Sequence, residues 1–253
     1  MTVLHDLSGL TALVTGASSG LGERFATVLA NAGAKVALAA RRTDRLEALR
    51  ARIEGQGGRA LPVRMDVTDL QSIADAVAHV ETELGPIHIL INNSGVSAPK
   101  RMVDVTESDY DFVMDTNLKG AFFVAREVAA QMMRHRVKGR IVNIASVAAN
   151  KYLGQLGVYG MSKSAVVYMT RAMAAEWGRE DVNTNAICPG YIETEMNRDH
   201  WDTEGGRKLI AMLPRRRVGD VGDLDGAILL LASPHSHFIN GAIINVDDGM
   251  SCL

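Results

Sequence analysis

Short apolar runs alternate with helix-forming segments along almost the whole chain of 253 residues. The runs are rich in Val, Ile, Leu and Ala at successive positions, which is typical of parallel strands covered by helices on both faces. A repeated strand–helix–strand order requires a parallel sheet with right-handed crossovers. The sequence therefore predicts a doubly wound α/β fold, in which a parallel seven-stranded sheet is flanked by helices and residues 1–253 form a single domain. The expected strands are Leu10–Thr15, Lys35–Ala40, Ala60–Met65, Ile87–Asn92, Arg140–Ala145, Val182–Cys188 and Ala242–Val246.

Two of the expected helices carry their own start signals. Thr68 and Gln71 have the spacing of a capping box and precede apolar residues at helical intervals. Thr106 and Asp109 have the same spacing and predict a second helix that continues towards Asn117. Both signals fall between expected strands, as a strand–helix–strand order requires.

Composition excludes several classes of protein. Hydrophobic residues make up 47% of the chain and charged residues 22%, so collagen-like, low-complexity and largely disordered chains are excluded. Lys and Arg number 27 against 29 Asp and Glu, and a net charge of −2 gives no overall electrostatic reason to bind nucleic acid or an anionic membrane. No apolar run reaches the roughly 18 residues of a membrane span.

The cysteines and histidines give no sign of a disulfide framework or a metal site. Cys188 and Cys252 lie far apart without a CxxC pattern, which predicts free thiols in a reducing compartment. The start of the chain lacks a signal-peptide pattern, so a cytoplasmic protein is expected. The seven histidines show no metal-ligand spacing, so no metal is expected, and none provides Ser146 with an evident base for acyl transfer.

The segment after the first expected strand is rich in glycine. Gly16 allows a tight turn, while Gly20 and Gly22 remove side chains where the backbone approaches a phosphate or a strand. The helix that begins near Leu21 offers free N–H groups and the positive end of its dipole to an anion. A glycine-rich turn without a ligand is the alternative, but its place between the first strand and the first helix favours a nucleotide site.

This turn resembles the TGxxxGxG motif of the short-chain dehydrogenase/reductase family, in the branch whose length this chain shares. The resemblance implies a Rossmann-type sheet and an oxidoreductase that transfers hydride between a nicotinamide cofactor and a ketone or secondary alcohol. Within the family, the chain is similar to carbonyl reductases of the 3-oxoacyl reductase type. The resemblance continues, in family order, with Asn92-Asn93-Ser94-Gly95, Asn117, Ser146, Tyr159-x-x-x-Lys163 and Pro189-Gly190.

Four residues are expected to carry the chemistry. Tyr159 and Lys163 are four apart in an expected helix over residues 158–177, so their side chains share one face. Ketone reduction needs a proton at oxygen, and a tyrosine supplies it if its pKa, ordinarily near 10, is lowered. We expect Lys163 to lower that pKa and Ser146 to hold the substrate oxygen. The resemblance implies that Asn117 orders a water leading to Lys163, although Asn117 and Ser146 taken singly also suit ordinary structural positions.

The choice of cofactor depends on the end of the second strand. Arg41 and Arg42 stand there, and no acid that would bind ribose hydroxyls appears before Asp44. A guanidinium suits a 2′-phosphate, so NADP(H) is favoured, with Arg41 the expected contact. Alternatively, the pair begins a solvated basic face with Arg45, and NAD(H) remains possible. The resemblance assigns cofactor contacts to Gly16, Ser18, Ser19, Gly20, Leu21, Gly22, Arg41, Arg42, Asp66, Val67, Asn93, Ser94, Gly95, Tyr159, Lys163, Pro189, Gly190, Ile192 and Thr194.

The region after the sixth expected strand interrupts the alternation and is too long for a plain connection. The resemblance implies that residues 190–217 form a mobile substrate-binding lid. Its apolar residues either line the substrate pocket or simply pack the lid on the core. Further on, Asp248 stands where the family usually has glycine, which puts the local turn in doubt. A largely apolar pocket is expected from Val96, Ser146, Ala148, Leu153, Tyr191, Met196 and Trp201.

Charged clusters bear on possible partners. The run Arg215–Arg217 is expected to end a helix or to form salt bridges within the chain. A second basic cluster, within residues 134–140, suggests a 3-oxoacyl-thioester reductase that docks an acidic acyl-carrier protein or acts on a CoA thioester. Glu176 and Glu180 disfavour the carrier protein, because further positive charge is expected at their helix end. The second cluster consists of Arg134, Arg136, Lys138 and Arg140.

A function of another class also remains open. Because a fold alone does not fix a function, the chain is either an NADP(H)-dependent enzyme or a non-catalytic nucleotide-sensing module. The presence of Ser146, Tyr159 and Lys163 together favours the enzyme. The expected partner is a small carbonyl or alcohol substrate, with no nucleic acid and no membrane, and the resemblance implies a homotetramer.

Overall fold

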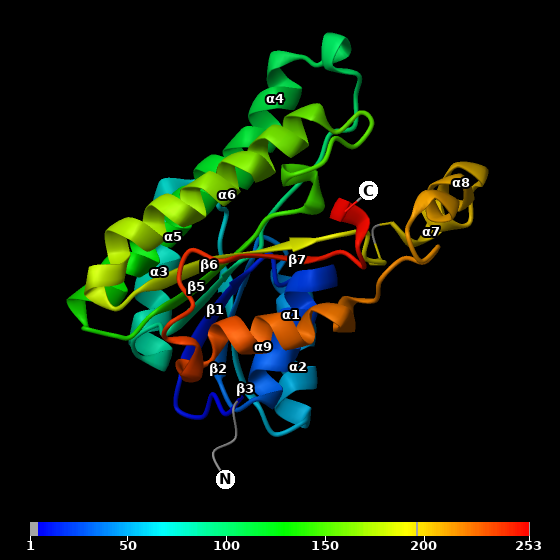
Figure 1. The fold of residues 1–253 in the computed structure, drawn as a ribbon. Coiled ribbons are helices and arrows are strands. Elements are labelled where there is room, and N and C mark those ends of the chain that lie inside the picture. The colour runs from blue at the N-terminus through cyan, green and yellow to red at the C-terminus, as the bar shows by residue number, and fades with distance from the viewer. Residues whose placement is uncertain (1–4, 196, 253) are drawn as a thin grey trace.

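Seven parallel strands form one sheet in the order β3-β2-β1-β4-β5-β6-β7 (Figure 1). The computed structural model describes residues 5–195 and 197–252. The predicted doubly wound fold is confirmed, and each strand end lies within two residues of its expected position. The strands are β1 (Thr11–Thr15), β2 (Lys35–Ala40), β3 (Arg59–Arg64), β4 (Ile89–Asn92), β5 (Arg140–Ile144), β6 (Asn183–Pro189) and β7 (Ile243–Val246).

Helices cover both faces of the sheet, which explains why the strands are apolar at successive positions (Figure 1). In β1, Leu13 packs towards α3, α5 and α6, whereas Ala12 and Val14 pack towards α1, α2 and α9. All three side chains are fully buried. The α-helices are α1 (Gly20–Asn31), α2 (Thr43–Gly55), α3 (Leu70–Leu84), α4 (Glu107–Met114), α5 (Ala121–Arg134), α6 (Gly157–Trp177), α7 (Arg198–Trp201), α8 (Glu204–Met212) and α9 (Asp225–Ala232).

Shorter helical turns join these elements. The segment Asp115–Gly120 between α4 and α5 is a π-helical turn, so the predicted helix towards Asn117 does not continue with regular α geometry. None of the helices in the described part of the chain is both long enough and apolar enough to cross a membrane. Single 3-10 turns occupy Met102–Asp104, Val147–Ala149, Gly178–Glu180, Val221–Leu224, Pro234–Ser236 and Met250–Cys252.

The two predicted capping boxes have different outcomes. Thr106 and Asp109 form theirs at the start of α4. The box predicted for Thr68 and Gln71 is wrong, because Asp69 caps α3 by accepting hydrogen bonds from the backbone N–H groups of residues 71 and 72. A carboxylate one residue later in the chain therefore takes the place of the threonine hydroxyl, which donates instead to Asp66.

The strand order reverses between β1 and β4, and sheets of this kind bind ligands at the carboxyl ends of the strands at such a switch point. The loop after β4 is fixed there to the end of β1. The Thr15 hydroxyl accepts the backbone N–H groups of Asn93 (2.9 Å) and Ser94 (3.1 Å), and the Asn93 side chain donates to the Thr15 carbonyl (3.0 Å). These contacts hold the carboxyl ends of β1 and β4 in fixed register.

The region after β6 is more ordered than a long loop. It contains α7 and α8, which stand beside one edge of the sheet, apart from the helices that cover its faces (Figure 1). Trp201 of α7 is buried and packs edge to face on Tyr191, with 5.5 Å between ring centroids. The indole N–H donates to the Asn197 side chain (3.3 Å). Packing therefore gives this region a small apolar centre of its own.

Candidate active site at the carboxyl ends of the strands

The glycine-rich turn after β1 leaves the start of α1 open. Gly16 and Gly20 have φ of 67° and 57°, which favours glycine at both positions. A Cβ atom on Gly22 would lie 2.2 Å from the Gly16 carbonyl oxygen, so no larger residue fits there. Ser19, the N-cap residue of α1, makes no side-chain capping bond, and the first N–H groups of the helix remain available to an anion. Leu21 lies in this first turn of α1.

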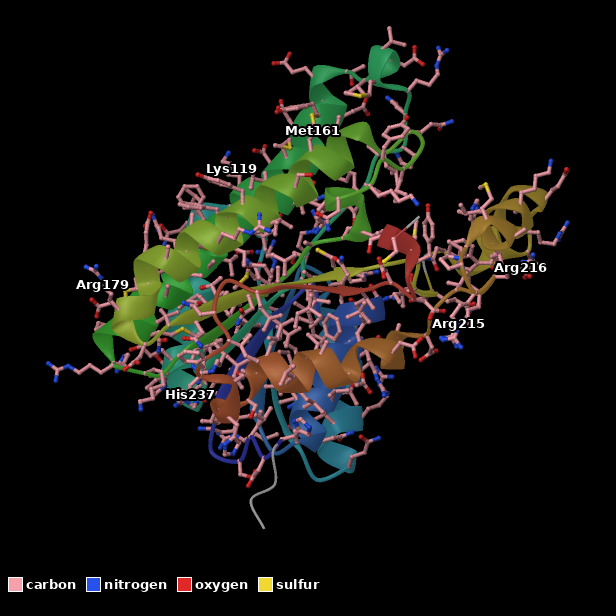
Figure 2. All side chains as sticks on the ribbon, in the orientation of Figure 1. Lys119, Met161, Arg179, Arg215, Arg216 and His237 are labelled. Carbon is pink, nitrogen blue, oxygen red and sulfur yellow. The ribbon has the colours of Figure 1, made fainter. Side chains whose placement is uncertain are left out.

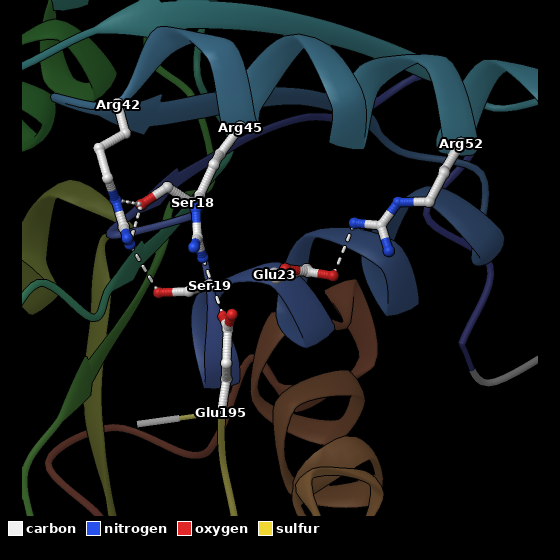
Figure 3. A network of polar contacts seen from close by, with 7 residues as sticks. All are labelled: Ser18, Ser19, Glu23, Arg42, Arg45, Arg52 and Glu195. Carbon is white, nitrogen blue, oxygen red and sulfur yellow. Dashed lines mark hydrogen bonds and ion pairs between the residues drawn. The ribbon is translucent and has the colours of Figure 1, made fainter. Parts of the chain in front are cut away.

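Two arginines of the β2–α2 region reach across this turn (Figure 3). Arg42 donates from Nη2 to the hydroxyls of Ser18 (2.9 Å) and Ser19 (2.8 Å). Arg45 donates to the carboxylate of Glu195, in the segment that follows β6 (2.8 Å). Basic charge and hydroxyl groups therefore meet at the rim of the glycine-rich turn.

Arg41 points in a different direction. Its exposed guanidinium has Nη1 3.9 Å from Oδ2 of Asp66, which follows β3. Burial raises the pKa of Asp66, but hydrogen bonds from Thr68 and the charge of Arg41 outweigh this, so the pKa lies below its ordinary value. The adenosine of the cofactor is expected at the carboxyl ends of β2 and β3. This part of the sheet carries Arg41, Asp66 and the buried Val67.

Asn117 joins three elements through its side chain. Oδ1 accepts the N–H of Val96 (2.7 Å), and Nδ2 donates to the Val96 carbonyl (2.9 Å) and to the Ser162 hydroxyl (3.1 Å). Both N–H groups of the amide are therefore occupied. A Cβ atom on Gly95 would lie 3.4 Å from Lys163 Nζ and 3.5 Å from Asn117 Oδ1, so the loop after β4 lies against both side chains.

Ser146, Tyr159 and Lys163 converge where β5 ends. Ser146 is buried and hydrogen-bonded to the Tyr159 side chain, and its hydroxyl accepts the N–H of Ala148 (3.1 Å). Lys163 is 4% exposed; Nζ donates to the Ile144 carbonyl (2.8 Å) and lies 5.7 Å from the centre of the Tyr159 ring. The structure therefore brings together the predicted serine, tyrosine and lysine.

The electrostatics of this cluster differ from the expectation for Tyr159. Burial raises the pKa of the Tyr159 phenol above its ordinary value; the Ser146 hydrogen bond acts against the shift, and Cys188 adds to it. The predicted lowering of the Tyr159 pKa is wrong for this arrangement, because desolvation outweighs the hydrogen bond from Ser146. Burial also lowers the pKa of Lys163 to about 8.

Two residues near the cluster were not predicted to have a role there. Ser162 donates to the Tyr159 carbonyl (2.7 Å) and accepts from Asn117, so it connects the π-helical turn to α6. The sequence signal that could have identified Ser162 was its position three residues after Tyr159. Cys188 is fully buried on β6, and burial raises the pKa of its thiol, which accepts the Ser146 backbone N–H. A cysteine alone in a strand gave no such signal.

The segment after β6 packs on the glycine-rich turn. Pro189 ends the strand, and a Cβ atom on Gly190 would lie 2.8 Å from the Asp247 Cα atom. Ile192 is buried, and a methyl group of Thr194 lies 3.5 Å from the position of a Cβ on Gly20. The four cofactor contacts predicted in this segment therefore lie between the end of β6 and the start of α1.

One of the predicted substrate-pocket residues, Tyr191, lines a cavity beside the segment after β6. A cavity of about 180 Å³ holds Tyr191 together with Leu213 and Met250, and Val96, Ala148 and Leu153 are not among its lining residues. Ala148 is buried beside Ser146, and Trp201 packs on Tyr191. Met196 lies outside the described residues.

The departure at Asp248 has a structural reason. Asp248 has φ of 53°, a left-handed conformation that Asp tolerates better than most residues. Its carboxylate accepts from Arg215 (3.2 Å) and Arg217 (2.7 Å), which confirms the salt-bridge alternative for the arginine run. The Asp248 carboxylate, which a glycine would lack, therefore connects the C-terminal segment to the end of residues 190–217.

Comparison with known proteins agrees with this geometry. The family model described as enoyl-(acyl carrier protein) reductase matches residues 16–251. Gluconate 5-dehydrogenase of Gluconobacter oxydans (strain 621H) is 39% identical over 98% of this chain and 97% of its own.

Two solved structures share the fold. A short-chain type dehydrogenase/reductase from Mycobacterium marinum has a TM-score of 0.94 at 37% identity, covering 99% of this chain and 98% of its own. A gluconate 5-dehydrogenase from Burkholderia cenocepacia J2315, in complex with NADP and tartrate, has a TM-score of 0.94 at 33% identity and the same coverage. With the Ser146, Tyr159 and Lys163 cluster beside an open glycine-rich turn, these matches show that the chain belongs to the short-chain dehydrogenase/reductase family of oxidoreductases.

Proposed function

We propose that this protein is an NADP(H)-dependent oxidoreductase that interconverts a ketone and a secondary alcohol. The observation that carries the proposal is the convergence of Ser146, Tyr159 and Lys163 beside the uncapped start of α1. When bound, the reduced nicotinamide supplies a hydride to the carbonyl carbon. The chain's own residues supply the proton and hold the oxygen that receives it.

Tyr159 is the proposed proton donor in reduction and acceptor in oxidation. Burial keeps the phenol protonated, as a donor must be, and the Ser146 hydroxyl is placed to bind the same substrate oxygen. Lys163 favours the phenolate left after transfer, because its ammonium faces the Tyr159 ring from 5.7 Å. Asn117 positions the loop after β4 against Lys163, and we assign any ordered water in the relay to its backbone, since its amide is occupied.

The residues around the glycine-rich turn fit a dinucleotide with a 2′-phosphate. The open N–H groups of α1 suit a pyrophosphate, and the space that a Cβ on Gly22 would fill is taken by backbone. Arg41 and Arg42 lie where a 2′-phosphate would meet guanidinium groups. The NADP bound in the Burkholderia cenocepacia relative supports the same preference here. The remaining proposed contacts are those predicted from the sequence.

Residues 190–217 are the proposed substrate lid. Thr194 rests against the glycine-rich turn, and Asp248 holds the other end of the segment, so both ends are anchored while α7 and α8 stand beside the sheet. The names of the relatives direct the first substrate tests to gluconate and 5-ketogluconate.

A 3-oxoacyl-thioester reductase is the second candidate, favoured by the description of the matching family model. The basic cluster offered for carrier docking is partly used within the chain. Arg134 forms an ion pair with Glu81, and Arg140 is buried and donates to backbone carbonyls. These contacts weigh against docking of an acyl-carrier protein and leave a CoA thioester as the stronger form of this alternative.

We also propose a homotetramer in the cytoplasm. Phe112, Phe122, Met161 and Tyr168 are exposed on the helical layer of α4, α5 and α6, and Figure 2 shows Met161 and Lys119 on its outer side. Exposed apolar side chains on one helical layer suit burial against a second copy. Cys188 and Cys252 are both free thiols, as suits a reducing compartment.

A substrate panel tests the proposal. Gluconate, 5-ketogluconate, simple ketones and acetoacetyl-CoA are incubated with each nicotinamide cofactor, and turnover is followed by cofactor absorbance. We expect turnover of a ketone or alcohol with NADP(H) preferred. Faster turnover of acetoacetyl-CoA than of every simple ketone would favour the second candidate. NADPH binding without turnover of any carbonyl compound would favour a nucleotide-sensing module.

A further inference from the structure

A cavity of about 500 Å³ lies at the amino ends of the strands. Leu10, His88 and Lys138 line it just before β1, β4 and β5, and the wall opposite is formed by residues after α9, including His235 and His237. Because the strands are parallel, their amino ends lie at the edge of the sheet opposite Ser146 and Tyr159. Figure 2 accordingly shows His237 at the end of the molecule away from Arg215. The cavity is therefore separate from the proposed active site.

Two cationic side chains, Lys138 and Arg140, line the cavity. Its lining contains Lys138, Arg140 and the imidazoles of residues 88, 235 and 237, and none of the described residues that line it is acidic. His88 is half-buried at its wall and accepts the N–H of Thr11 through Nδ1 (3.2 Å). Lys138, His235 and His237 are exposed at its rim. A positive potential of this kind, beside low-dielectric walls, attracts an anion.

Arg140 places a fixed charge at the base of the cavity. It is 4% exposed, and its guanidinium donates to the carbonyls of Ser233 (3.2 Å), Gly139 (2.8 Å) and Pro234 (3.2 Å). These acceptors are neutral, and the Asp181 carboxylate acts on the guanidinium only through space. Buried charges are ordinarily paired with an opposite charge, so Arg140 supplies a site that an anionic ligand would complete.

The rest of the lining is apolar. Leu10, Ile89 and Ala232 form walls that a hydrocarbon chain can contact, and the volume is in the range of small-molecule sites. A single buried cation matches one negative charge. A dianionic phosphate would lose more hydration against such walls than a carboxylate.

We propose that this cavity binds a small amphiphilic monocarboxylate, with its hydrocarbon chain against Leu10, Ile89 and Ala232 and its carboxylate towards Arg140 and Lys138. The site is independent of the catalytic proposal and of the choice of substrate. The proposed ligand belongs to a different chemical class from the nicotinamide dinucleotide.

Titration calorimetry with octanoate, octylamine and 1-octanol on the full chain tests the ligand class. We expect octanoate to bind at least about tenfold more tightly than either comparison compound, because only it carries the complementary charge. The proposal would be overturned if 1-octanol bound as tightly as octanoate, or if octylamine or inorganic phosphate bound more tightly than octanoate. It would also be overturned if octanoate did not bind. Saturating NADP+ is expected to leave octanoate affinity unchanged, and loss of octanoate binding with NADP+ would place the anion in the cofactor site instead.

Two rim substitutions locate the site without disturbing Arg140, which holds the chain after α9. Lys138→Glu and His237→Glu change exposed side chains outside the proposed active site, and each is expected to weaken octanoate binding about fivefold. Arg179→Glu, an exposed arginine that does not line the cavity, is the matched control and should bind octanoate like the wild type. Wild-type affinity in both rim variants would contradict this location.

Discussion

Lys163 Nζ faces the Tyr159 ring at 5.7 Å while it donates to the Ile144 carbonyl at 2.8 Å. The lysine is thus held by the end of β5 with its ammonium group near the tyrosine ring. Burial lowers the Lys163 pKa to about 8 and raises that of Tyr159. The proposed catalytic pair therefore combines a phenol whose pKa is raised with a lysine whose pKa is lowered.

The first prediction is a pH dependence of reduction. Below pH 8 Lys163 is charged, and as the pH rises through about 8 it loses the proton that favours phenolate. We expect kcat/KM for ketone reduction to fall across this range, since kcat/KM reports ionisations of the unliganded enzyme and substrate. Lys163→Arg keeps its positive charge at high pH. The activity that this variant retains should therefore begin to fall only at a higher pH. A flat profile to pH 9.5 would contradict the assignment.

The same shift predicts the direction of a stability change. The Lys163 pKa is lowered from 10.5 to about 8 on folding, so between these values the unfolded chain binds more protons than the folded chain. The free energy of unfolding should therefore rise with pH in this window, by up to about 3 kcal/mol. Denaturant unfolding at pH 8 and pH 10 measures it. Lys163→Met removes the titrating group and should remove this increment.

Cofactor choice is tested at Arg41. We expect Arg41→Ala to raise the KM for NADPH about tenfold, since one charge-assisted phosphate contact is lost, and to leave the KM for NADH unchanged. Arg42→Ala also releases the Ser18 and Ser19 hydroxyls and should raise the KM for both cofactors. An unchanged NADPH to NADH ratio in Arg41→Ala would mean that Arg41 is only surface charge.

Gly22 provides a steric test of the turn. Gly22→Ala would place Cβ 2.2 Å from the Gly16 carbonyl oxygen, so the turn must shift. We expect a loss of stability on the order of 1–3 kcal/mol together with at least tenfold weaker NADPH binding. Gly55→Ala, at the end of α2 with open space around it, is the matched control and should be neutral or slightly stabilising. NADPH affinity can be measured by fluorescence titration.

Asp248 is expected to act on substrate binding through the lid. Asp248→Asn removes the charge that holds Arg215 and Arg217, and we expect the substrate KM to rise about threefold at unchanged kcat. Asp248→Gly should have the same effect, because it also lacks the carboxylate. Arg216→Ala, between the two paired arginines, serves as control. A lower kcat with an unchanged KM would show that the contact does not position the lid.

The sheet and the central site could be predicted because both depend on local pattern. Strands buried on two faces carry apolar residues at successive positions, and a spacing of four on a helix puts Tyr159 and Lys163 on one side. Neighbouring cap signals were harder to separate, since Asp69 competes with Thr68 for the start of α3. Spacing identifies candidates but not which of two adjacent oxygens the backbone selects.

Features that depend on distant contacts could not be predicted. The partners Arg217 and Asp248 are 31 residues apart in sequence, and Arg24 and Asp225 are 201 residues apart. The pKa of Tyr159 depends on how deeply it is buried, which spacing does not reveal. The π-helical turn around Asn117 likewise follows from packing against the loop after β4.

The central claim is that Tyr159 transfers the proton, and the most direct measurement is single-turnover reduction by Tyr159→Phe. The variant keeps the ring and loses the hydroxyl. We expect NADPH affinity within about twofold of the wild type and hydride transfer slowed by at least about a hundredfold. Hydride transfer at the wild-type rate in this variant would contradict the account.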